Sequence, residues 1–199
     1  MYRKKQYCTL VLVVINVLVF LWLSFHGMTE NALFMLDNGA MYVPYIQEYG
    51  EYYRLVTSMF LHFGFEHLMN NMISLWFLGG VLEQEIGKIK FLLIYFLSGI
   101  AGNVVAALGD IYTGDYAVAA GASGAIFGII GALLYIALRN HGRIGSISGK
   151  GIVLMVALSL YYGFTSTGIA NLAHIGGLVT GFVLSVLLYR KRHKYEYYY

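Results

Sequence analysis

The sequence contains few charged residues, one cysteine and one proline. Lys, Arg, Asp and Glu together make up 12% of the 199 residues, whereas soluble domains carry about 25%. Because Cys8 is the single cysteine, a disulfide within the chain is excluded. Hydrophobic residues make up 59% of the chain. This balance excludes an ordinary soluble domain and indicates a membrane protein.

Six apolar runs are candidates for membrane-spanning helices, since about 20 mainly apolar residues are needed to cross a bilayer. The predicted spans are residues 8–25, 66–83, 91–108, 121–138, 151–164 and 169–189. The sequence therefore predicts an all-α polytopic membrane protein, with residues 1–199 forming a single membrane domain. A long segment, about residues 26–66, separates the first two spans. Its aromatic clusters favour a position in the membrane interface.

The distribution of basic residues predicts the orientation of the chain. Positive charge in short loops marks the cytoplasmic side of a membrane. With six spans, every Lys and Arg except Arg54 falls at a terminus or in a loop on one side. Both termini are therefore predicted to be cytoplasmic. The formal net charge of +3 reflects this orientation and needs no nucleic-acid partner.

Polar residues within the predicted spans are the informative positions, because polar groups in a bilayer usually face the bundle interior or a water-filled cavity. They are His67, Asn70, Asn71, Ser74, Ser98, Asn103, Ser123, Ser159, Asn171, His174 and Ser185. The second, fourth and sixth spans run in the same direction, so residues near their starts lie at similar depth. The residues at this depth are His67, Asn71, Ser123 and His174.

A serine, two histidines and a carboxamide at one depth indicate acyl-transfer chemistry. Serine becomes a strong nucleophile when a base accepts its proton, and the pKa of histidine suits that task. The oxyanion of a tetrahedral intermediate also needs hydrogen-bond donors, which backbone N–H groups and Asn or His side chains supply. Ser123, in the first turn of the fourth span, offers its own N–H.

Glycines flank this serine and recur in the sixth span. Gly124 and Gly128 share the GxxxG spacing, as do Gly177 and Gly181. Small residues at this spacing let helix backbones approach closely, which would bring Ser123 within reach of His174. Taken alone, GxxxG is most often a packing motif, and a lone serine usually bonds its own helix. The stretch "GASGA" from Gly121 also lacks the fifth glycine and the preceding strand of the soluble hydrolase elbow.

The ordered motifs resemble the rhomboid intramembrane serine proteases. They are "YR" at Tyr53 and Arg54, "HFGFEHLMNN" from His62, "GASGAIFG" around Ser123 and "AHIGGLVTG" around His174. The resemblance extends from the first span to about Tyr189 and implies a six-transmembrane-helix rhomboid bundle.

The resemblance also implies residue roles. Ser123 would be the nucleophile and His174 the general base, while His67, Asn71 and the Ser123 N–H would form the oxyanion hole. The resemblance further implies a structural rather than chemical role for two groups of residues. The first is the glycines Gly121, Gly124, Gly177 and Gly181, and the second is Arg54, Glu51 and His62 in the segment between the first two spans. The family often has Trp where this chain has Tyr53. It often has Tyr where this chain has Phe127, which keeps the ring stacked on the histidine and loses a hydroxyl.

The leading hypothesis is a serine endopeptidase that cleaves transmembrane segments of membrane-anchored proteins near their outer boundary. It needs the lipid bilayer and water but no cofactor or metal, and the resemblance suggests a bacterial plasma membrane. The short fifth span and "GFTSTG" would serve as gate and cap. One alternative is a non-catalytic relative that binds transmembrane clients. Another is a small transporter, although the inner halves of the spans are almost purely apolar and a transporter needs a polar path there. The oligomeric state stays open.

Overall fold

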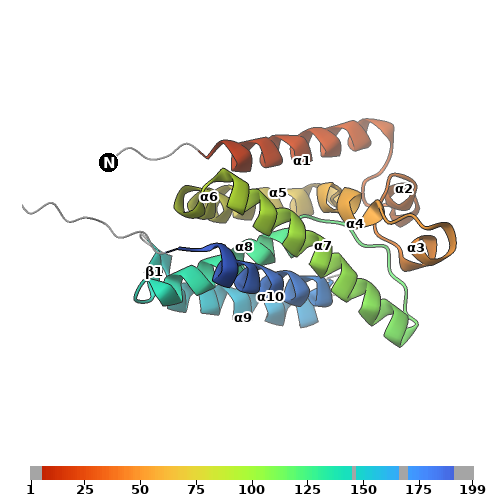
Figure 1. Cartoon of the computed structure of the whole chain (residues 1–199). Helices are drawn as coiled ribbons and strands as arrows, with labels where there is room; N and C mark the ends of the chain where they lie inside the picture. The colour runs from red at the N-terminus through yellow and green to blue at the C-terminus, as the bar shows by residue number, and fades with distance from the viewer. Residues whose placement is uncertain (1–5, 145–146, 166–169, 191–199) are drawn as a thin grey trace, which may run out of the picture.

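The computed structural model describes residues 6–144, 147–165 and 170–190, and these residues are mostly helical (Figure 1). The expectation of a helical chain with several apolar helices is confirmed. The helices are α1 (Tyr7–His26), α2 (Ala32–Asp37), α3 (Val43–Tyr49), α4 (Arg54–Thr57), the 3-10 turn η1 (Ser58–Phe60), α5 (Gly64–Ser74), the π-helical turn η2 (Leu75–Gly79), α6 (Gly80–Ile86), α7 (Lys88–Thr113), α8 (Ser123–Arg139), α9 (Gly149–Thr165) and α10 (Asn171–Leu188).

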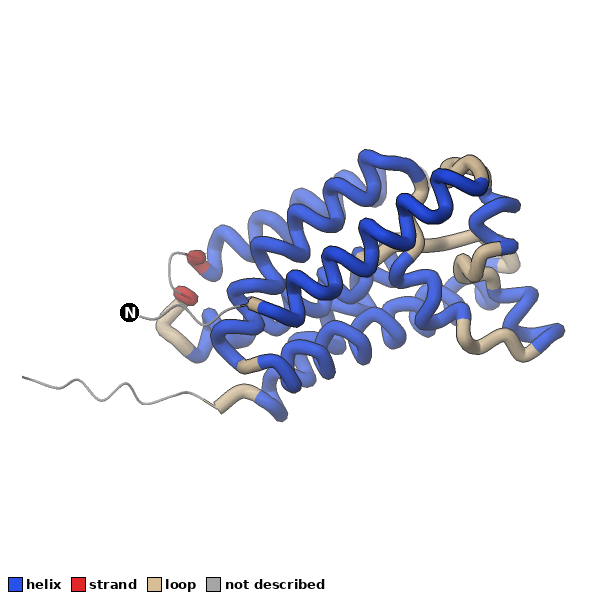
Figure 2. The backbone as a smooth tube through the Cα atoms, turned by 90° about the horizontal axis from the view of Figure 1, so that it is seen from above, coloured by secondary structure: helices blue, strands red, loops and turns tan. Residues whose placement is uncertain are grey.

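The centre of the molecule is the trio α7, α8 and α10, which pack against one another along much of their length. The continuous helix formed by α5, η2 and α6 lies beside α1, while α9 packs on the opposite side against α8 (Figures 1 and 2). Two ends are distinct. Helices α2, α3 and α4 gather at one, the α2–α4 end, and the chain segment β1 marks the other, the hairpin end (Figure 1).

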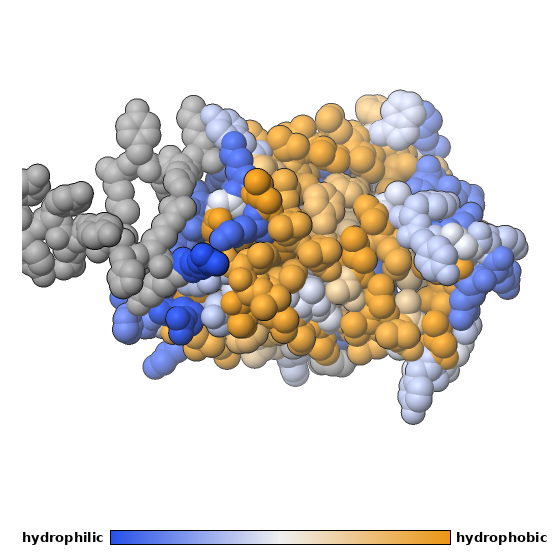
Figure 3. All heavy atoms as spheres, in the orientation of Figure 1, coloured by the Kyte–Doolittle hydropathy of each residue, from blue (hydrophilic) through white to orange (hydrophobic). Residues whose placement is uncertain are grey.

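On the face shown in Figure 3, an apolar band covers the middle of the molecule and hydrophilic residues gather toward its two ends. In the described part of the chain, three helices are long and apolar enough to cross a bilayer: α1, α7 and α10. Helix α8 and residues Gly149–Ser159 of α9 are shorter apolar helical segments. Apolar side chains exposed around a middle band are expected where lipid, rather than water, is the surrounding solvent.

The core is built mainly from α8 and α7. In α8, Ile129, Leu133 and Ile136 are fully buried, and they belong to the same cluster as Phe91 and Ile94 of α7. Residues of α8 are buried on nearly every side, as expected of a helix at the centre of a bundle. Because α8 is packed at the centre of the bundle, the residues in its first turn are held in a fixed position.

Helix α8 begins at Ser123, two residues later than the predicted span 121–138. Gly121 has φ of +138°, a conformation that L side chains rarely adopt, so it cannot continue into a right-handed helix. With 17 residues, α8 is about 25 Å long, shorter than the roughly 30 Å hydrocarbon core of a bilayer. The extended residues before it carry the chain into the bundle, so the first turn of α8 is recessed.

The loop between α8 and α9 contains two short strands, which an all-α expectation did not include. β1 (Arg143–Ile144) and β2 (Ile147–Ser148) pair antiparallel, with Arg143 opposite Ser148 and Ile144 opposite Ile147. Gly142 precedes them with φ of +84°. The sequence around these strands, residues 140–150, is rich in Gly and Ser and has no alternation of apolar and polar residues long enough to predict a strand.

Candidate active site

Ser123 and His174 lie side by side at the starts of two packed helices. Ser123 is the first residue of α8, and His174 is in the first turn of α10. The distance from Ser123 Oγ to His174 Nε2 is 2.9 Å, within the range for a strong hydrogen bond. His174 is buried, whereas Ser123 is partly exposed. The pair therefore has the geometry needed for transfer of the serine proton to the imidazole.

The aromatic ring of Phe127 fixes the plane of this imidazole. Phe127 lies one helical turn after Ser123, and its ring stacks on His174 with centroids 4.2 Å apart and planes inclined by 6°. Among the described residues, His174 Nδ1 has no hydrogen-bond partner. Orientation of the imidazole therefore comes from stacking, and within the described part of the chain Ser123 and His174 form a pair rather than a triad with a carboxylate.

Glycines bring α8 and α10 into direct backbone contact. A Cβ added at Gly177 would collide with the carbonyl oxygen of Gly124, and one at Gly181 would collide with that of Gly128. A backbone carbonyl cannot move aside as a flexible side chain can. The two GxxxG pairs thus form one seam, and this seam sets the separation between the helices that carry Ser123 and His174.

His67 lies next to the chain segment that leads into the nucleophile. A Cβ added at Gly121 would be 2.9 Å from Cε1 and Nε2 of His67 and 3.7 Å from Ser123 Oγ. Gly121 therefore provides the space that the imidazole occupies, and its positive φ is a second requirement for glycine. His67 and Ser123 Oγ therefore both lie within 4 Å of the position that a Cβ at Gly121 would take.

Asn71 points its amide group back at its own helix. Its Nδ2 donates a hydrogen bond to the carbonyl oxygen of His67 at 2.9 Å, and the side chain is buried. In this arrangement one N–H of the carboxamide is used within α5, as is common for polar residues inside helices. This bond occupies one of the two N–H groups of Nδ2, and the oxyanion role of Asn71 stays a prediction.

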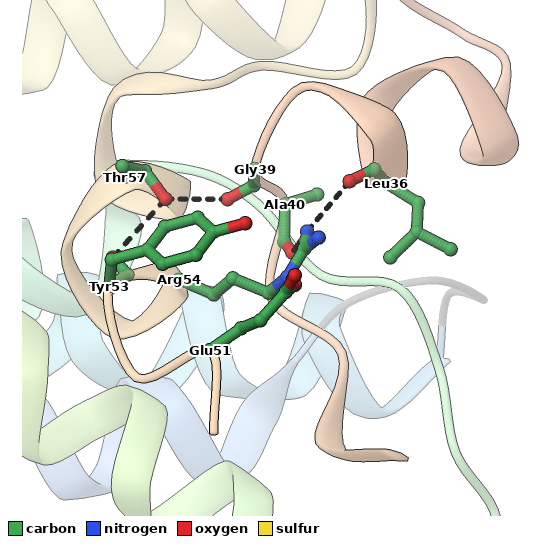
Figure 4. Close-up of polar contacts among 7 residues, drawn as sticks. All are labelled: Leu36, Gly39, Ala40, Glu51, Tyr53, Arg54 and Thr57. Carbon is green, nitrogen blue, oxygen red and sulfur yellow. Dashed lines mark hydrogen bonds and ion pairs between the residues drawn. The ribbon is translucent and has the colours of Figure 1, made fainter. Parts of the chain in front are cut away.

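Arg54 holds the chain between α2 and α3 in place (Figure 4). Its guanidinium donates hydrogen bonds to the carbonyl oxygens of Leu36 at 2.6 Å and Ala40 at 2.8 Å, and it pairs with Glu51 at 2.5 Å. Thr57 Oγ1 adds a bond of 2.7 Å to the Gly39 carbonyl. These contacts fix the turn at residues 36–40 against α4, and Arg54 itself is buried.

His62 is a buried residue in the chain between η1 and α5. Burial, together with the nearby His67, lowers the pKa of His62 to about 3. A neutral imidazole can accept a hydrogen bond, and Nε2 of His62 lies 3.5 Å from the N–H of Ala122. The rings of His62 and His67 meet edge to face with centroids 5.2 Å apart. His62 thus contacts both the entry to α8 and a proposed oxyanion residue.

Glu83 is a buried acidic residue that sequence reasoning missed. Near the hairpin end, its carboxylate accepts hydrogen bonds from the backbone N–H groups of Cys8 and Thr9 and from Thr9 Oγ1, at 2.8 to 3.0 Å. A negative charge at a helix N-terminus satisfies unpaired N–H groups and the helix dipole. The expectation that the inner halves of the spans are almost purely apolar is therefore incomplete. The sequence signal that could have revealed this contact is an acidic residue at the last position of the predicted span 66–83.

These features define a helical membrane protein with a serine–histidine pair recessed between glycine-lined helices. Comparison with known proteins agrees. A sequence model of the Rhomboid domain matches residues 49–191. The chain is 37% identical over 184 residues to Rhomboid protease GluP of Bacillus subtilis strain 168, covering 92% of this chain and 35% of that protein. It is 36% identical over 174 residues to the rhomboid-family protein YdcA of the same organism, covering 87% and 85%.

A plant relative is equally similar. RHOMBOID-like protein 5 of Arabidopsis thaliana is 37% identical over 184 residues, with 87% of this chain and 58% of that protein covered. The chain thus spans about a third of GluP and a little over half of the plant protein. It belongs to the rhomboid family and is a multi-pass membrane protein. The resemblance seen in the sequence is confirmed.

Proposed function

We propose that this protein is an intramembrane serine endopeptidase that uses Ser123 and His174 as a catalytic dyad. The observation that carries the proposal is the 2.9 Å contact between Ser123 Oγ and His174 Nε2 at the recessed start of α8. A partly exposed serine oxygen beside a buried imidazole is the arrangement that nucleophilic catalysis requires. The chain's match to the Rhomboid domain supports the same reaction class.

The dyad would act in two stages. Ser123 Oγ attacks the carbonyl carbon of the scissile peptide bond while His174 Nε2 accepts the serine proton, which gives a tetrahedral oxyanion. The imidazolium then donates that proton to the leaving amine, and an acyl-enzyme remains. Water, deprotonated by His174, attacks this ester and releases the second product and the serine.

Three groups would stabilise the oxyanion. Ser123 lies at the first position of α8, where its backbone N–H has no partner within the helix. His67 lies against Gly121, close to Ser123, and Asn71 is one turn further along the same helix face. Donors of this kind are worth about 10²–10³ in kcat each. Gly121, Gly124, Gly177 and Gly181 would hold these groups at the required separation.

The proposed topology has six membrane-spanning segments with both termini in the cytoplasm and residues 1–199 as one membrane domain. It is supported by the apolar band in Figure 3 and by basic residues at the hairpin end, including Lys88, Lys90 and Arg139. The α2–α4 end, which carries the long segment between α1 and α5, would face outward. A bacterial plasma membrane is the proposed location.

The proposed substrates are membrane-anchored proteins cut near the outer boundary of a transmembrane segment. Helix α8 ends next to β1 at the hairpin end, so its first residue, Ser123, is at the end of the helix that faces the α2–α4 end (Figure 1). A peptide bond within a helix is shielded by its hydrogen-bonded backbone, so the substrate has to unwind locally. We expect small or helix-breaking residues near the cut to favour cleavage.

The side of α9 is the proposed route of entry. Val153, Leu154 and Leu158 are each more than half exposed, so α9 has fewer apolar contacts to lose when it moves than α8 has. Residues 166–169, which include part of the predicted cap "GFTSTG", lie outside the described residues.

The decisive experiment is cleavage of a fluorogenic transmembrane peptide by the purified protein in liposomes. Wild type is compared with Ser123→Ala and His174→Ala, and circular dichroism checks that each variant is folded. We expect both variants to lose at least about 10³-fold in kcat. Full activity in Ser123→Ala would contradict the proposed mechanism. An inert wild type that still captures transmembrane helices would instead support a client-binding protein.

A further inference from the structure

The extended residues that lead into Ser123 are held at three points by other parts of the chain. Met41 and Ala119 exchange backbone hydrogen bonds of 2.8 and 2.9 Å. The N–H of Gly121 donates to the carbonyl oxygen of Ser58 at 2.9 Å. The N–H of Ala122 points at His62 Nε2. The backbone that delivers the nucleophile is thus positioned by the segment between α1 and α5, and its last strong backbone contact before Ser123 is with Ser58.

Ser58 is itself held by one side chain from the central helix α7. Asn103 Nδ2 donates hydrogen bonds to the carbonyl oxygen of Leu55 at 2.9 Å and to Ser58 Oγ at 3.0 Å. Ser58 is almost completely buried, so these are bonds in a place where water does not compete freely. Both contacts lie on the junction of α4 and η1. Asn103 therefore fastens that junction to α7.

We propose that Asn103 is a positioning residue for the nucleophile. It fixes the α4–η1 junction, the junction presents the Ser58 carbonyl oxygen, and that oxygen holds the N–H of Gly121, two residues before Ser123. The inference rests on the proposed function, because the position of the Ser123 N–H and Oγ matters for rate only if they act on a substrate.

The physical reason for an effect on rate is the sensitivity of catalysis to small displacements. An oxyanion donor must lie within a few tenths of an ångström of its productive position, and a displacement of about 1 Å can cost roughly 100-fold. Without Asn103, the α4–η1 junction loses its hydrogen bonds to α7 and is held by packing and by the bonds of Arg54 and Thr57 to the turn at residues 36–40. We expect the Ser58 carbonyl oxygen to shift with it. Gly121, with no side chain to anchor it, follows that shift. Substrate binding along the α9 side uses other groups, so KM is expected to change little.

The test compares Asn103→Leu with Asn16→Ala and Ser58→Ala in the full chain reconstituted in liposomes. Leucine has nearly the shape of asparagine and donates no hydrogen bond. Asn16 is the matched control, a buried intramembrane asparagine whose Nδ2 donates to Leu12 of its own helix α1. Ser58→Ala removes one of the two Asn103 bonds and keeps the carbonyl oxygen that holds Gly121. Cleavage of the fluorogenic peptide gives kcat and KM, and a fluorophosphonate probe gives the rate of Ser123 labelling.

We expect Asn103→Leu to lower kcat about 10-fold, a fraction of what a full 1 Å displacement costs, with KM within about twofold of wild type. The labelling rate should fall by a similar factor while the thermal unfolding midpoint stays above the assay temperature. Ser58→Ala should lose less than about threefold, and Asn16→Ala should keep the wild-type kcat and labelling rate.

Three results would overturn the inference: wild-type kcat in folded Asn103→Leu, a loss confined to KM, or an equal loss in Asn16→Ala. If Asn103→Leu does not fold, Asn103→Gln is measured, because it keeps the donors and displaces them by one methylene. Wild-type kcat and labelling in that variant would also overturn it. If wild type labels but cleaves no peptide, the proposed function fails, and the labelling rates still decide the role of Asn103.

Discussion

The two sides of α8 are packed in opposite ways. Toward α10, the seam formed by Gly124, Gly128, Gly177 and Gly181 brings backbone against backbone, and a single added carbon would collide with a carbonyl oxygen. Toward α9, the contact is made by a helix in which Ile152 is buried and most other described side chains are partly or largely exposed. The first side fixes the separation of the helices that carry Ser123 and His174. The second has fewer buried side chains to lose if α9 moves.

This difference matches the needs of a protease that works on helices. The reacting atoms require a rigid frame, because small displacements cost rate. A substrate helix requires a path of entry, which only a weakly packed element can open. If the proposal is right, substitutions along the seam will be severe and the same kinds of change in α9 will be mild.

Gly177→Leu should have the largest effect. The side chain would meet the Gly124 carbonyl oxygen, so α10 has to move away and His174 with it. We expect a loss of more than about 3 kcal/mol in unfolding free energy, the upper end of the usual cost of overpacking, and no measurable cleavage. The matched change, Gly151→Leu in α9, faces only Ser148 Oγ at 3.1 Å and should leave stability within about 1 kcal/mol. Equal damage from both variants would remove the contrast between the two sides.

Phe127→Ala tests the stacking that orients His174. Removing a buried ring usually costs about 3 kcal/mol or more, and the imidazole loses the surface that holds its plane. We expect unfolding in detergent to shift accordingly and kcat to fall at least about 10-fold at a temperature where the variant is folded. Phe127→Tyr keeps the ring and should stay within about threefold of wild type. A Phe127→Ala variant with the wild-type kcat would show that stacking does not orient His174.

Arg54→Ala tests the fastening of the outer segment. The carbonyl oxygens of Ala40 and Leu36 would both lose their guanidinium partner, and that of Leu36 would keep its backbone N–H partners, Gly39 among them. A buried acceptor left without a partner costs about 1–3 kcal/mol, so we expect destabilisation of about 2 kcal/mol and faster proteolysis at residues 36–41. The control Arg139→Ala removes an exposed arginine at the other end and should change stability by less than about 0.5 kcal/mol. Unchanged proteolysis in Arg54→Ala would contradict the proposed role.

The low pKa of His62 predicts a dependence of stability on pH. The group binds a proton near pH 6.5 when unfolded but only near pH 3 when folded. The folded state is therefore unaffected above pH 6.5 and loses stability as pH falls from 6.5 toward 3, by up to about 1.4 kcal/mol per pH unit. In His62→Gln this contribution is absent. Equilibrium unfolding of both proteins between pH 7 and pH 5 should give a shallower decline for the variant, and parallel curves would refute the assignment.

Leu158→Ala in α9 should have the smallest effect. The side chain is 59% exposed, so its removal leaves no cavity of consequence, and stability should change by less than about 0.5 kcal/mol. The matched change in the core, Leu133→Ala in α8, removes a fully buried side chain and should cost about 2–5 kcal/mol. Thermal unfolding of both variants measures the difference. A large loss in Leu158→Ala would show that α9 is packed as firmly as α8.

Sequence reasoning found the polar positions at one depth because a bilayer makes each of them costly. His67, Ser123 and His174 stood out against apolar surroundings, and the spacing of Gly177 and Gly181 indicated close helix approach. Their positions in the sequence did not give the distances between these side chains in the folded protein, however. Periodicity also did not reveal Glu83 as a cap for α1, because its partners are backbone N–H groups more than 70 residues away.

The sequence by itself determined that the chain is a multi-pass membrane protein of the rhomboid family, since apolar length and ordered motifs are local properties. Tertiary structure alone decided how distant segments meet: the 2.9 Å contact of Ser123 with His174, the start of α8 at Ser123 and the link from Asn103 through Ser58 to Gly121. The physical reason is that hydrogen bonds between distant segments depend on the packing of whole helices. A pattern of residue types specifies which groups are available, and only the folded backbone specifies which of them touch.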